Sequence, residues 1–114
     1  MKDDRLYVTH VLDCIDRIEK YTTEGQASFF RSDLIQDAVA RNLQTLAESV
    51  KRISAERKSA HPEVDWRGVT GFRNILVHEC LSIGLARVWE IVSLDLPVLK
   101  EQMAAISRDL PSSD

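Results

Sequence analysis

One short segment of the sequence carries side chains that could do chemistry together: residues 73–79, with Arg73, Asn74 and His78. On a helix, Asn74 and His78 are four residues apart and share a face. Arg73 precedes His78 by five residues, so the two side chains point ~140° apart. A single helix therefore brings them together poorly, whereas two symmetric copies of the helix would place both sets in one cleft.

These side-chain types suit cleavage of RNA without a metal ion. A neutral imidazole at His78 can take the proton from a ribose 2′-hydroxyl, which attacks the adjacent phosphorus, and an imidazolium can protonate the leaving 5′-oxygen. Arg73 can stabilise the charge that develops on the phosphate. Asn74 can hold the phosphate or fix the imidazole tautomer. The product would be a 2′,3′-cyclic phosphate, so DNA, which lacks the 2′-hydroxyl, would not be a substrate.

A plainer interpretation of the same residues is a surface arginine followed by a histidine that the helix dipole favours near a C-terminus. The other histidines, His10 and His61, are expected to be structural or solvent-exposed. Cys14 and Cys80 are expected to be free thiols, because no cysteine and histidine spacing in the chain resembles a metal site. The sequence therefore predicts neither a metal nor another cofactor.

The composition is that of an ordinary globular protein: 114 residues, 44% hydrophobic and 29% charged, with a net charge of −3. We expect a single helical domain over residues 1–114. No apolar run approaches the ~20 residues that span a membrane, and the polar start predicts no secretory signal, so a cytoplasmic location is expected. The segment from Lys51 to Arg73 contains six basic and three acidic residues, so its local net charge is +3. This surplus permits a phosphate-binding surface or simply a solvated helix end and loop.

The spacing of apolar residues predicts an all-α fold, a four- or five-helix up-and-down bundle. Helices are expected over about 4–22, over 33–57 with Asp33 and Gln36 as a capping box, and from Asp65 as N-cap toward His78. An apolar seam over 85–110 fits two helices, the second N-capped by Asp95, or one kinked helix. The apolar surface of these predicted helices is larger than one small core must bury, so we expect a second copy to cover part of it in a homodimer.

The segment 73–79 also resembles the Arg-x4-His motif of HEPN domains, in particular the HepT-like toxins. Further segments resemble this family in order and spacing, so the resemblance covers nearly the whole chain. They are 36–43, 48–52, 66–72, 88–92 and 95–97.

The resemblance implies a helical homodimer with the motif at the dimer cleft. It implies a metal-independent ribonuclease that acts as the toxin of a toxin–antitoxin pair, with RNA as its substrate and no cofactor. It also implies an MntA-like nucleotidyltransferase antitoxin, which silences such toxins by transferring AMP to a tyrosine. By the resemblance, Arg73 and His78 are catalytic and Asn74 is a supporting residue.

The chain departs from the family at Cys80, because the extended motif is Arg-x4-His-x-Tyr. A thiol cannot replace the phenol's hydrogen bond or accept AMP as the tyrosine does. Three interpretations are open: a natural variant silenced by complex formation alone, an engineered substitution that blocks modification, or a weakened toxin. Arg41 and Glu48, two turns apart on one helix face, could line the cleft or pair with a neighbour. Trp66 and Trp89 are expected to anchor the core or an interface.

Two other functions remain possible from the sequence. The missing tyrosine and the acidic net charge are compatible with a non-catalytic helical module that binds a nucleotidyltransferase. Binding of the complex to its own promoter DNA has little support, because the sequence has no helix-turn-helix signature.

Overall fold

The computed structural model describes residues 2–74 and 84–111. His78 and Cys80 lie outside the described residues. Within them every regular element is helical, which confirms the all-α prediction. None of the described helices is both long and apolar enough to cross a membrane.

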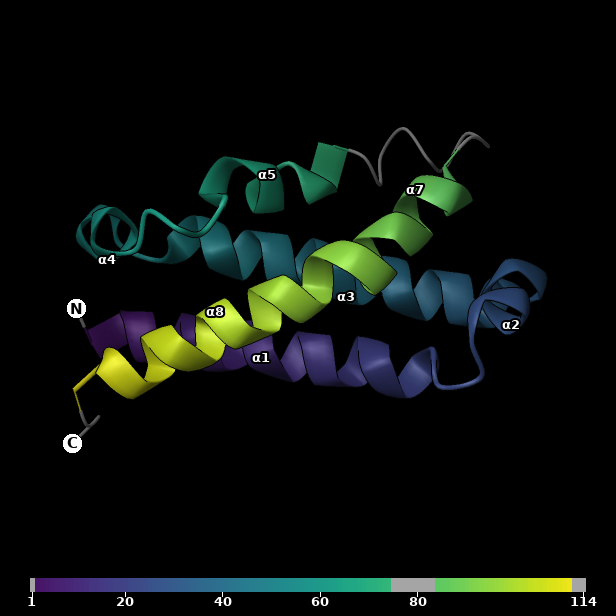
Figure 1. Ribbon diagram of the computed structural model, residues 1–114, viewed down its shortest axis with the longest axis horizontal. Coiled ribbons are helices and arrows are strands. Elements are labelled where there is room, and N and C mark those ends of the chain that lie inside the picture. The colour runs from purple at the N-terminus through teal and green to yellow at the C-terminus, as the bar shows by residue number, and fades with distance from the viewer. Residues whose placement is uncertain (1, 75–83, 112–114) are drawn as a thin grey trace.

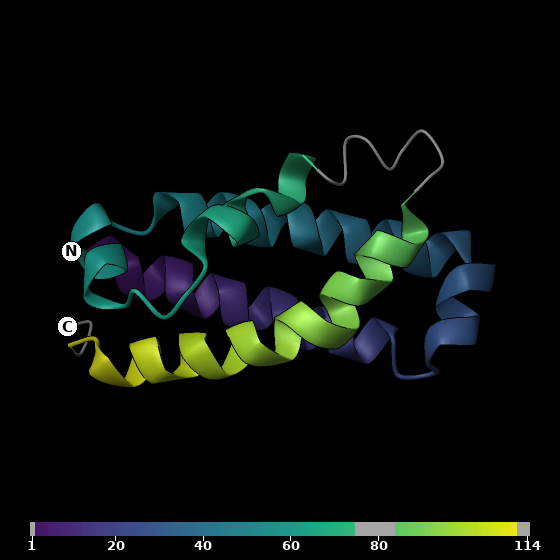
Figure 2. The same cartoon turned by 45° about the horizontal axis from the view of Figure 1, so that its top comes forward.

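The helices run up and down along one long axis (Figures 1 and 2). Helix α1 (Lys2–Tyr21) is followed by the short α2 (Gln26–Arg31), which turns the chain into the antiparallel α3 (Asp33–Arg52). After α4 (Ala55–Ala60), helix α5 (Trp66–Thr70) lies against α3, and the C-terminal stretch returns along α1. The up-and-down arrangement predicted from the sequence is confirmed.

The core is formed by one apolar stripe on each long helix. In α1 the stripe is covered on two sides, because it contacts both α3 and the C-terminal helix. The spacings of three and four residues place these side chains on one face of each helix. The fully buried members are Val8, Val11, Ile15 and Ile18 in α1, Val39, Leu43, Leu46 and Val50 in α3, and Met103 and Ile106 near the C-terminus.

The prediction of one helix over 33–57 is wrong. Helix α3 ends at Arg52, the backbone leaves the helical conformation at Ile53, and α4 begins two residues later. Ile53 has an extended backbone, with φ −64° and ψ 140°. Ser54 donates from its backbone N–H and its hydroxyl to the Asp4 carboxylate, at 2.9 and 2.7 Å. The Ser54 hydroxyl also accepts a bond from the Arg57 N–H at 3.1 Å, which caps α4. A contact from α1 therefore ends one helix and begins the next.

The predicted capping box at Asp33 is also displaced by one residue. Ser32 is the N-cap of α3, and its hydroxyl accepts a bond from the Ile35 N–H at 3.2 Å. Gln36 donates instead to the carbonyl oxygens of Phe29 and Phe30, at 2.9 and 3.3 Å. It thus satisfies carbonyl groups at the C-terminal end of α2, a helix that the spacing of apolar residues did not predict.

The C-terminal stretch is one bent helical run: α7 (Leu85–Glu90), a π-helical turn η1 (Ile91–Asp95) and α8 (Leu96–Asp109). Asp95 has helical φ and ψ of −83° and −42° and makes no side-chain cap. Helix α8 does begin directly after Asp95, but the predicted side-chain cap is absent and the run is continuous, as the kinked-helix alternative expects. Pro97 lies two residues after Asp95, and the wide turn includes the carbonyl four residues earlier, which a proline ring would crowd in a regular α-helix.

Candidate nucleic-acid interface

The described part of the predicted motif, Arg73 and Asn74, lies on the surface just after α5. Both residues are exposed, whereas Phe72 before them is 4% exposed and packs in the core. The Asn74 N–H donates to the Gly71 carbonyl oxygen at 3.0 Å, and residues 72–74 are helical. Burial of Phe72 therefore fixes the backbone that presents Arg73 and Asn74 to solvent.

Helix α5 positions this segment, and its N-cap is the one predicted. The Asp65 carboxylate accepts a bond from the Gly68 N–H at 3.0 Å. A Cβ at position 68 would collide with this carboxylate, so the glycine that weakens the helix is needed by its cap. The helix predicted to run on toward His78 is interrupted at Gly71, whose N–H donates to the Arg67 carbonyl oxygen at 2.9 Å.

Trp66 ties α5 to the end of α4. Its indole Nε1–H donates to the carbonyl oxygens of Lys58 and His61, at 3.1 and 3.0 Å. The ring is partly buried against the core. This agrees with the expectation that Trp66 anchors packing, and it fixes the place of Lys58 relative to α5.

Arg73 and Asn74 form part of a shallow hollow of about 550 Å³, which we call the basic hollow. Its described lining contains four cationic side chains and no carboxylate. The cations come from α3, α4, α5 and the segment after α5. The lining residues are Lys51, Lys58, Trp66, Arg67, Thr70, Gly71, Arg73 and Asn74.

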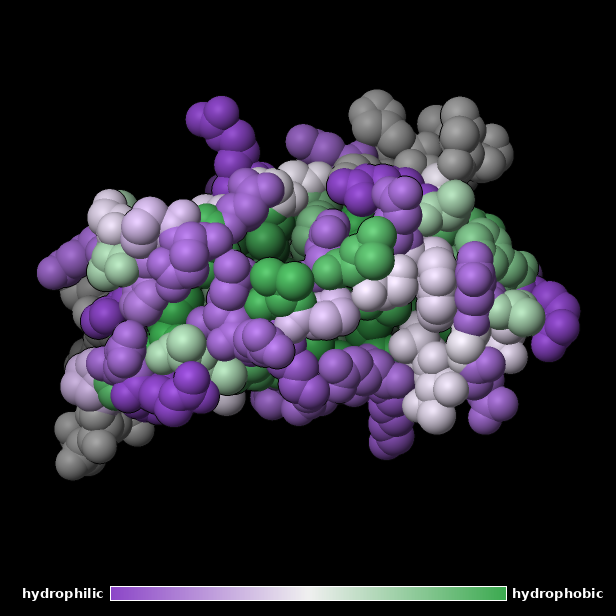
Figure 3. Space-filling model, viewed as in Figure 1, coloured by the Kyte–Doolittle hydropathy of each residue, from purple (hydrophilic) through white to green (hydrophobic). Residues whose placement is uncertain are grey.

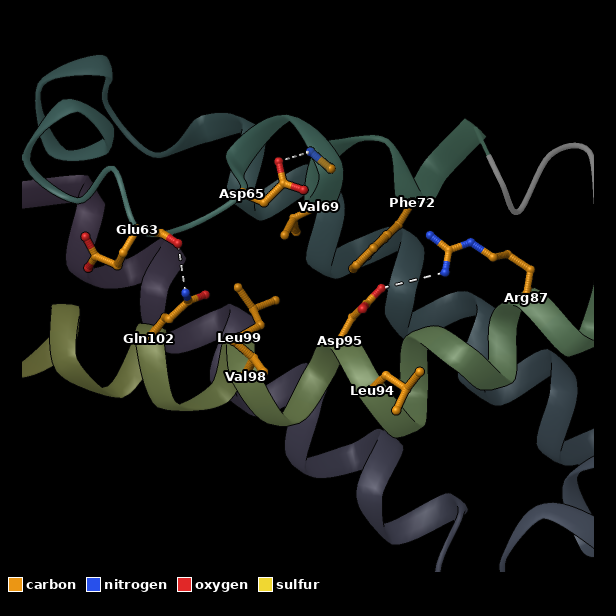
Figure 4. A pocket seen from close by; sticks show the side chains of 11 residues that line it. Glu63, Asp65, Val69, Phe72, Arg87, Leu94, Asp95, Val98, Leu99 and Gln102 are labelled. Atoms are coloured by element: carbon orange, nitrogen blue, oxygen red, sulfur yellow. Dashed lines mark hydrogen bonds and ion pairs between the residues drawn. The ribbon is translucent and has the colours of Figure 1, made fainter.

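A second, more enclosed hollow of about 400 Å³ lies between α5 and the α7–α8 run (Figure 4). In this α5–α8 hollow, Val69 of α5 and Phe72, which follows α5, extend toward the α7–α8 side. Leu94 and Val98 line it while 64% and 56% exposed. On this face Figure 3 shows hydrophobic side chains between α5 and α8 among hydrophilic ones. Arg73 does not line it, so we assign the candidate RNA site to the basic hollow.

Helix α5 separates the charges of the region 51–73. Glu63 and Asp65 line the α5–α8 hollow together with Asp95. A backbone hydrogen bond, and then a bond from His61 at 3.1 Å, lower the pKa of Glu63, so this carboxyl stays ionised. The sequence showed a local basic surplus, and the structure concentrates it on one side of a helix.

The remaining predicted residues lie elsewhere. Arg41 and Glu48 are both exposed on α3 and are not among the residues lining the basic hollow, so their role in a cleft stays a prediction. His10 Nδ1 lies 2.8 Å from the Ser49 hydroxyl, between α1 and α3. His61 is 9% exposed and bridges Glu63 to Asp109 of α8. Trp89 packs on Phe29, with ring centroids 5.2 Å apart.

Sequence reasoning missed the grouping of Lys51, Lys58 and Arg67 around Arg73. All were counted in the basic surplus, but so were Arg52 and Arg57. Arg57 Nε lies 3.9 Å from the Asp4 carboxylate and does not line the hollow. No spacing rule separates these cations, because their grouping depends on the break at Ile53 and on the Trp66 hydrogen bonds.

Comparison with known proteins gives one family. The family model described as "Ribonuclease HepT-like" matches residues 11–106. A Methanocaldococcus jannaschii protein, named a gamma-glutamylcyclotransferase and provisionally an RNase, is 33% identical over 96% of this chain, which spans 50% of that protein. A provisionally named RNase of Caldanaerobacter subterraneus is 29% identical over 93% of this chain and 96% of its own length. A probable ribonuclease HepT of Thermococcus cleftensis is 33% identical over 82% of this chain and 86% of its own length. No solved structure is significantly similar to the chain.

Proposed function

Because the chain belongs to the family of HepT-like ribonucleases, we propose that it is an endoribonuclease that cleaves RNA with Arg73 and His78 and without a metal ion. The observation that carries this proposal is the family match over residues 11–106, which includes the whole Arg-x4-His segment. The basic hollow supports this proposal. Arg73 and Asn74 are exposed in it, and its described lining contains no carboxylate, so its cations are accessible to a phosphate.

In the proposed reaction His78 removes the proton from the 2′-hydroxyl, and the resulting oxygen attacks the adjacent phosphorus. The bond from phosphorus to the 5′-oxygen breaks, and an imidazolium returns a proton to that oxygen. Arg73 stabilises the negative charge on the phosphate during the transfer. On one helix Arg73 and His78 point ~140° apart, which favours a cleft between two copies of the chain, where Arg73 of one copy can lie opposite His78 of the other.

We further propose that the protein is the toxin of a toxin–antitoxin pair that acts on RNA in the cytoplasm. Its expected antitoxin is a nucleotidyltransferase of the MntA type. With Cys80 at the position of the family's tyrosine, transfer of AMP to that position has no acceptor phenol. Silencing by binding alone is then the simplest regulation for this chain.

The catalytic proposal is tested with purified protein and an RNA substrate. Arg73→Ala and His78→Ala should each lower the cleavage rate by roughly 10²–10⁴-fold, the usual contribution of such groups. A 2′-deoxy nucleotide at the cleaved position should block the reaction, and a chelator should leave it unchanged. Arg108→Ala, which removes an exposed arginine on α8, is the matched control. Equal cleavage by both motif variants would show that a contaminating nuclease makes the cuts.

The α5–α8 hollow supports a second candidate function, a non-catalytic module that binds a partner protein. Its exposed Leu94 and Val98 are apolar groups that a partner could cover. Under this alternative, Leu94→Ser with Val98→Ser would abolish binding of the nucleotidyltransferase, and expression of the wild-type chain would not inhibit growth. Growth inhibition that depends on His78 would exclude it.

A further inference from the structure

We propose that the basic hollow binds the phosphates of an RNA strand. This binding track leads the strand to Arg73. Lys51, Lys58 and Arg67 are its positioning residues. They hold the strand and take no part in bond breaking. The identity of the ligand as RNA rests on the proposed function, whereas the track itself rests on the geometry of the hollow.

The cations converge because local contacts fix the segments that carry them. The Lys58 ammonium donates to the Lys51 carbonyl oxygen in the last turn of α3, at 3.3 Å. This places a positive charge at the negative end of the α3 dipole. The Trp66 bond to the Lys58 carbonyl oxygen then joins α4 to α5, where Arg67 follows directly. The arrangement is therefore formed before any ligand binds.

Within residues 2–74 and 84–111 no carboxylate pairs with the charges in the hollow, whereas several cations elsewhere have partners. Arg87 pairs with Glu90 at 3.0 Å, and Lys100 pairs with Glu19 at 2.9 Å. Arg5 donates to the carbonyl oxygens of Pro111 and Leu110, at 3.0 and 2.7 Å. By comparison, no carboxylate within residues 2–74 and 84–111 forms an ion pair with the four cations of the basic hollow. Like charges that repel one another in a concave surface attract a polyanion.

The shape of the hollow fits a strand better than a single anion. Its volume of about 550 Å³ is spread over side chains from four segments, so one phosphate could not contact all the cations. A strand carries phosphates in series and can contact them one after another. The indole of Trp66 adds an aromatic wall of the kind on which unpaired bases stack. We therefore assign the track to single-stranded RNA.

The test compares two double variants that remove the same charge. Lys51→Gln with Arg67→Gln removes two exposed cations from the hollow, and Lys20→Gln with Arg108→Gln removes two from α1 and α8. The probe is a fluorescent 2′-O-methyl RNA oligonucleotide, which cannot be cleaved because the attacking hydroxyl is blocked. Polarisation titrations from 50 to 300 mM salt give the affinity and its salt dependence.

For single strands the slope of log affinity against log salt is about −0.7 per neutralised phosphate. The hollow variant should therefore have a slope smaller in magnitude by about 1.4, and it should bind about tenfold or more weakly at 50 mM salt. The single variant Arg67→Lys keeps the charge and should therefore retain most of the wild-type affinity. The Lys20 and Arg108 control should keep the wild-type slope. Equal slopes and affinities for the two double variants, or no binding by the wild type, would overturn the track.

The binding and cleavage measurements separate the track from the proposed function. His78→Ala should bind the probe with the wild-type slope while it cleaves no RNA. If no form of the protein cleaves RNA but the slopes differ as expected, the track stands and the ribonuclease proposal fails. If the wild type and the hollow variant cleave and bind equally, the track fails and the ribonuclease proposal stands. Thermal unfolding of both double variants checks that each is folded.

Discussion

At the residue scale, the buried Asp4 carboxylate joins the first turn of α1 to the segment between α3 and α4. Asp4 is 1% exposed, and its carboxylate accepts two bonds from Ser54, fifty residues away. A buried charged group is stable only when hydrogen bonds compensate for lost water. Asp4 therefore fixes where α3 ends and α4 begins, and through α4 it fixes the place of Lys58 in the basic hollow.

Replacing Asp4 by alanine should lower the free energy of unfolding by about 1–3 kcal/mol, because the partly buried Ser54 N–H and hydroxyl lose their partner. Urea unfolding followed by circular dichroism measures the change. Asp3→Ala is the matched control, since Asp3 is exposed in the same turn of α1. It should change stability by less than about 0.5 kcal/mol. Equal effects of the two variants would show that helix charge, and not the Ser54 contacts, explains the loss.

Cys14 should be inert in the folded protein. Its side chain is 0% exposed, and burial raises the pKa of its thiol above 9.0, so the reactive thiolate is rare at neutral pH. Iodoacetamide at pH 7.5, followed by peptide mass spectrometry, should label Cys14 only after urea is added. Rapid labelling in the absence of urea would show that α1 opens from the bundle.

At the element scale, the difference between Ser32 and Asp33 gives a direct test of where α3 begins. Ser32→Ala removes the hydroxyl that accepts the Ile35 N–H and should cost about 1 kcal/mol, within a range of about 0.5–2. Asp33→Ala removes only a first-turn charge and should cost about 0.3–1 kcal/mol. Chemical unfolding measures both. A larger loss for Asp33→Ala would restore the capping box read from the sequence.

The same elements show what the sequence could and could not predict. Helices α1 and α3 were predictable because each repeats its apolar residues over several turns, as Val39, Leu43 and Leu46 do. Helices α2 and α4 have six residues each, which is too few to reveal a period. The end of α3 depends on Asp4, a contact that no local pattern records. The π-helical turn before Pro97 replaced the cap predicted at Asp95, because the helical backbone continues through Asp95.

At the scale of the whole molecule, the candidate site was only partly predictable. The motif identified Arg73 and Asn74, and the structure places both on the surface in one hollow. The other cations of that hollow come from α3, α4 and α5, so their convergence is a property of the assembled bundle. The local surplus of charge indicated a basic surface but could not indicate on which side of α5 it lies.

The proposed cleft between two copies leads to a prediction about mixed dimers. Arg73→Ala and His78→Ala should each be inactive alone, because each homodimer lacks one of the two groups that the reaction needs. If the two proteins are unfolded together in urea and refolded, the mixed dimers contain one intact Arg73 and one intact His78 in a shared cleft. Cleavage should then reappear at a rate below that of the wild type.

This recovery depends on exchange of chains, so it has a stringent control. The two variants mixed without unfolding should stay inactive when exchange is slow, and each variant refolded alone should stay inactive always. On one helix the two side chains point ~140° apart, which is why a site within a single chain is geometrically poor. Mass spectrometry can show that the dimers have exchanged chains. If cleavage still does not recover, each site needs both residues from one chain. The symmetric cleft would then be wrong even if the ribonuclease activity is real.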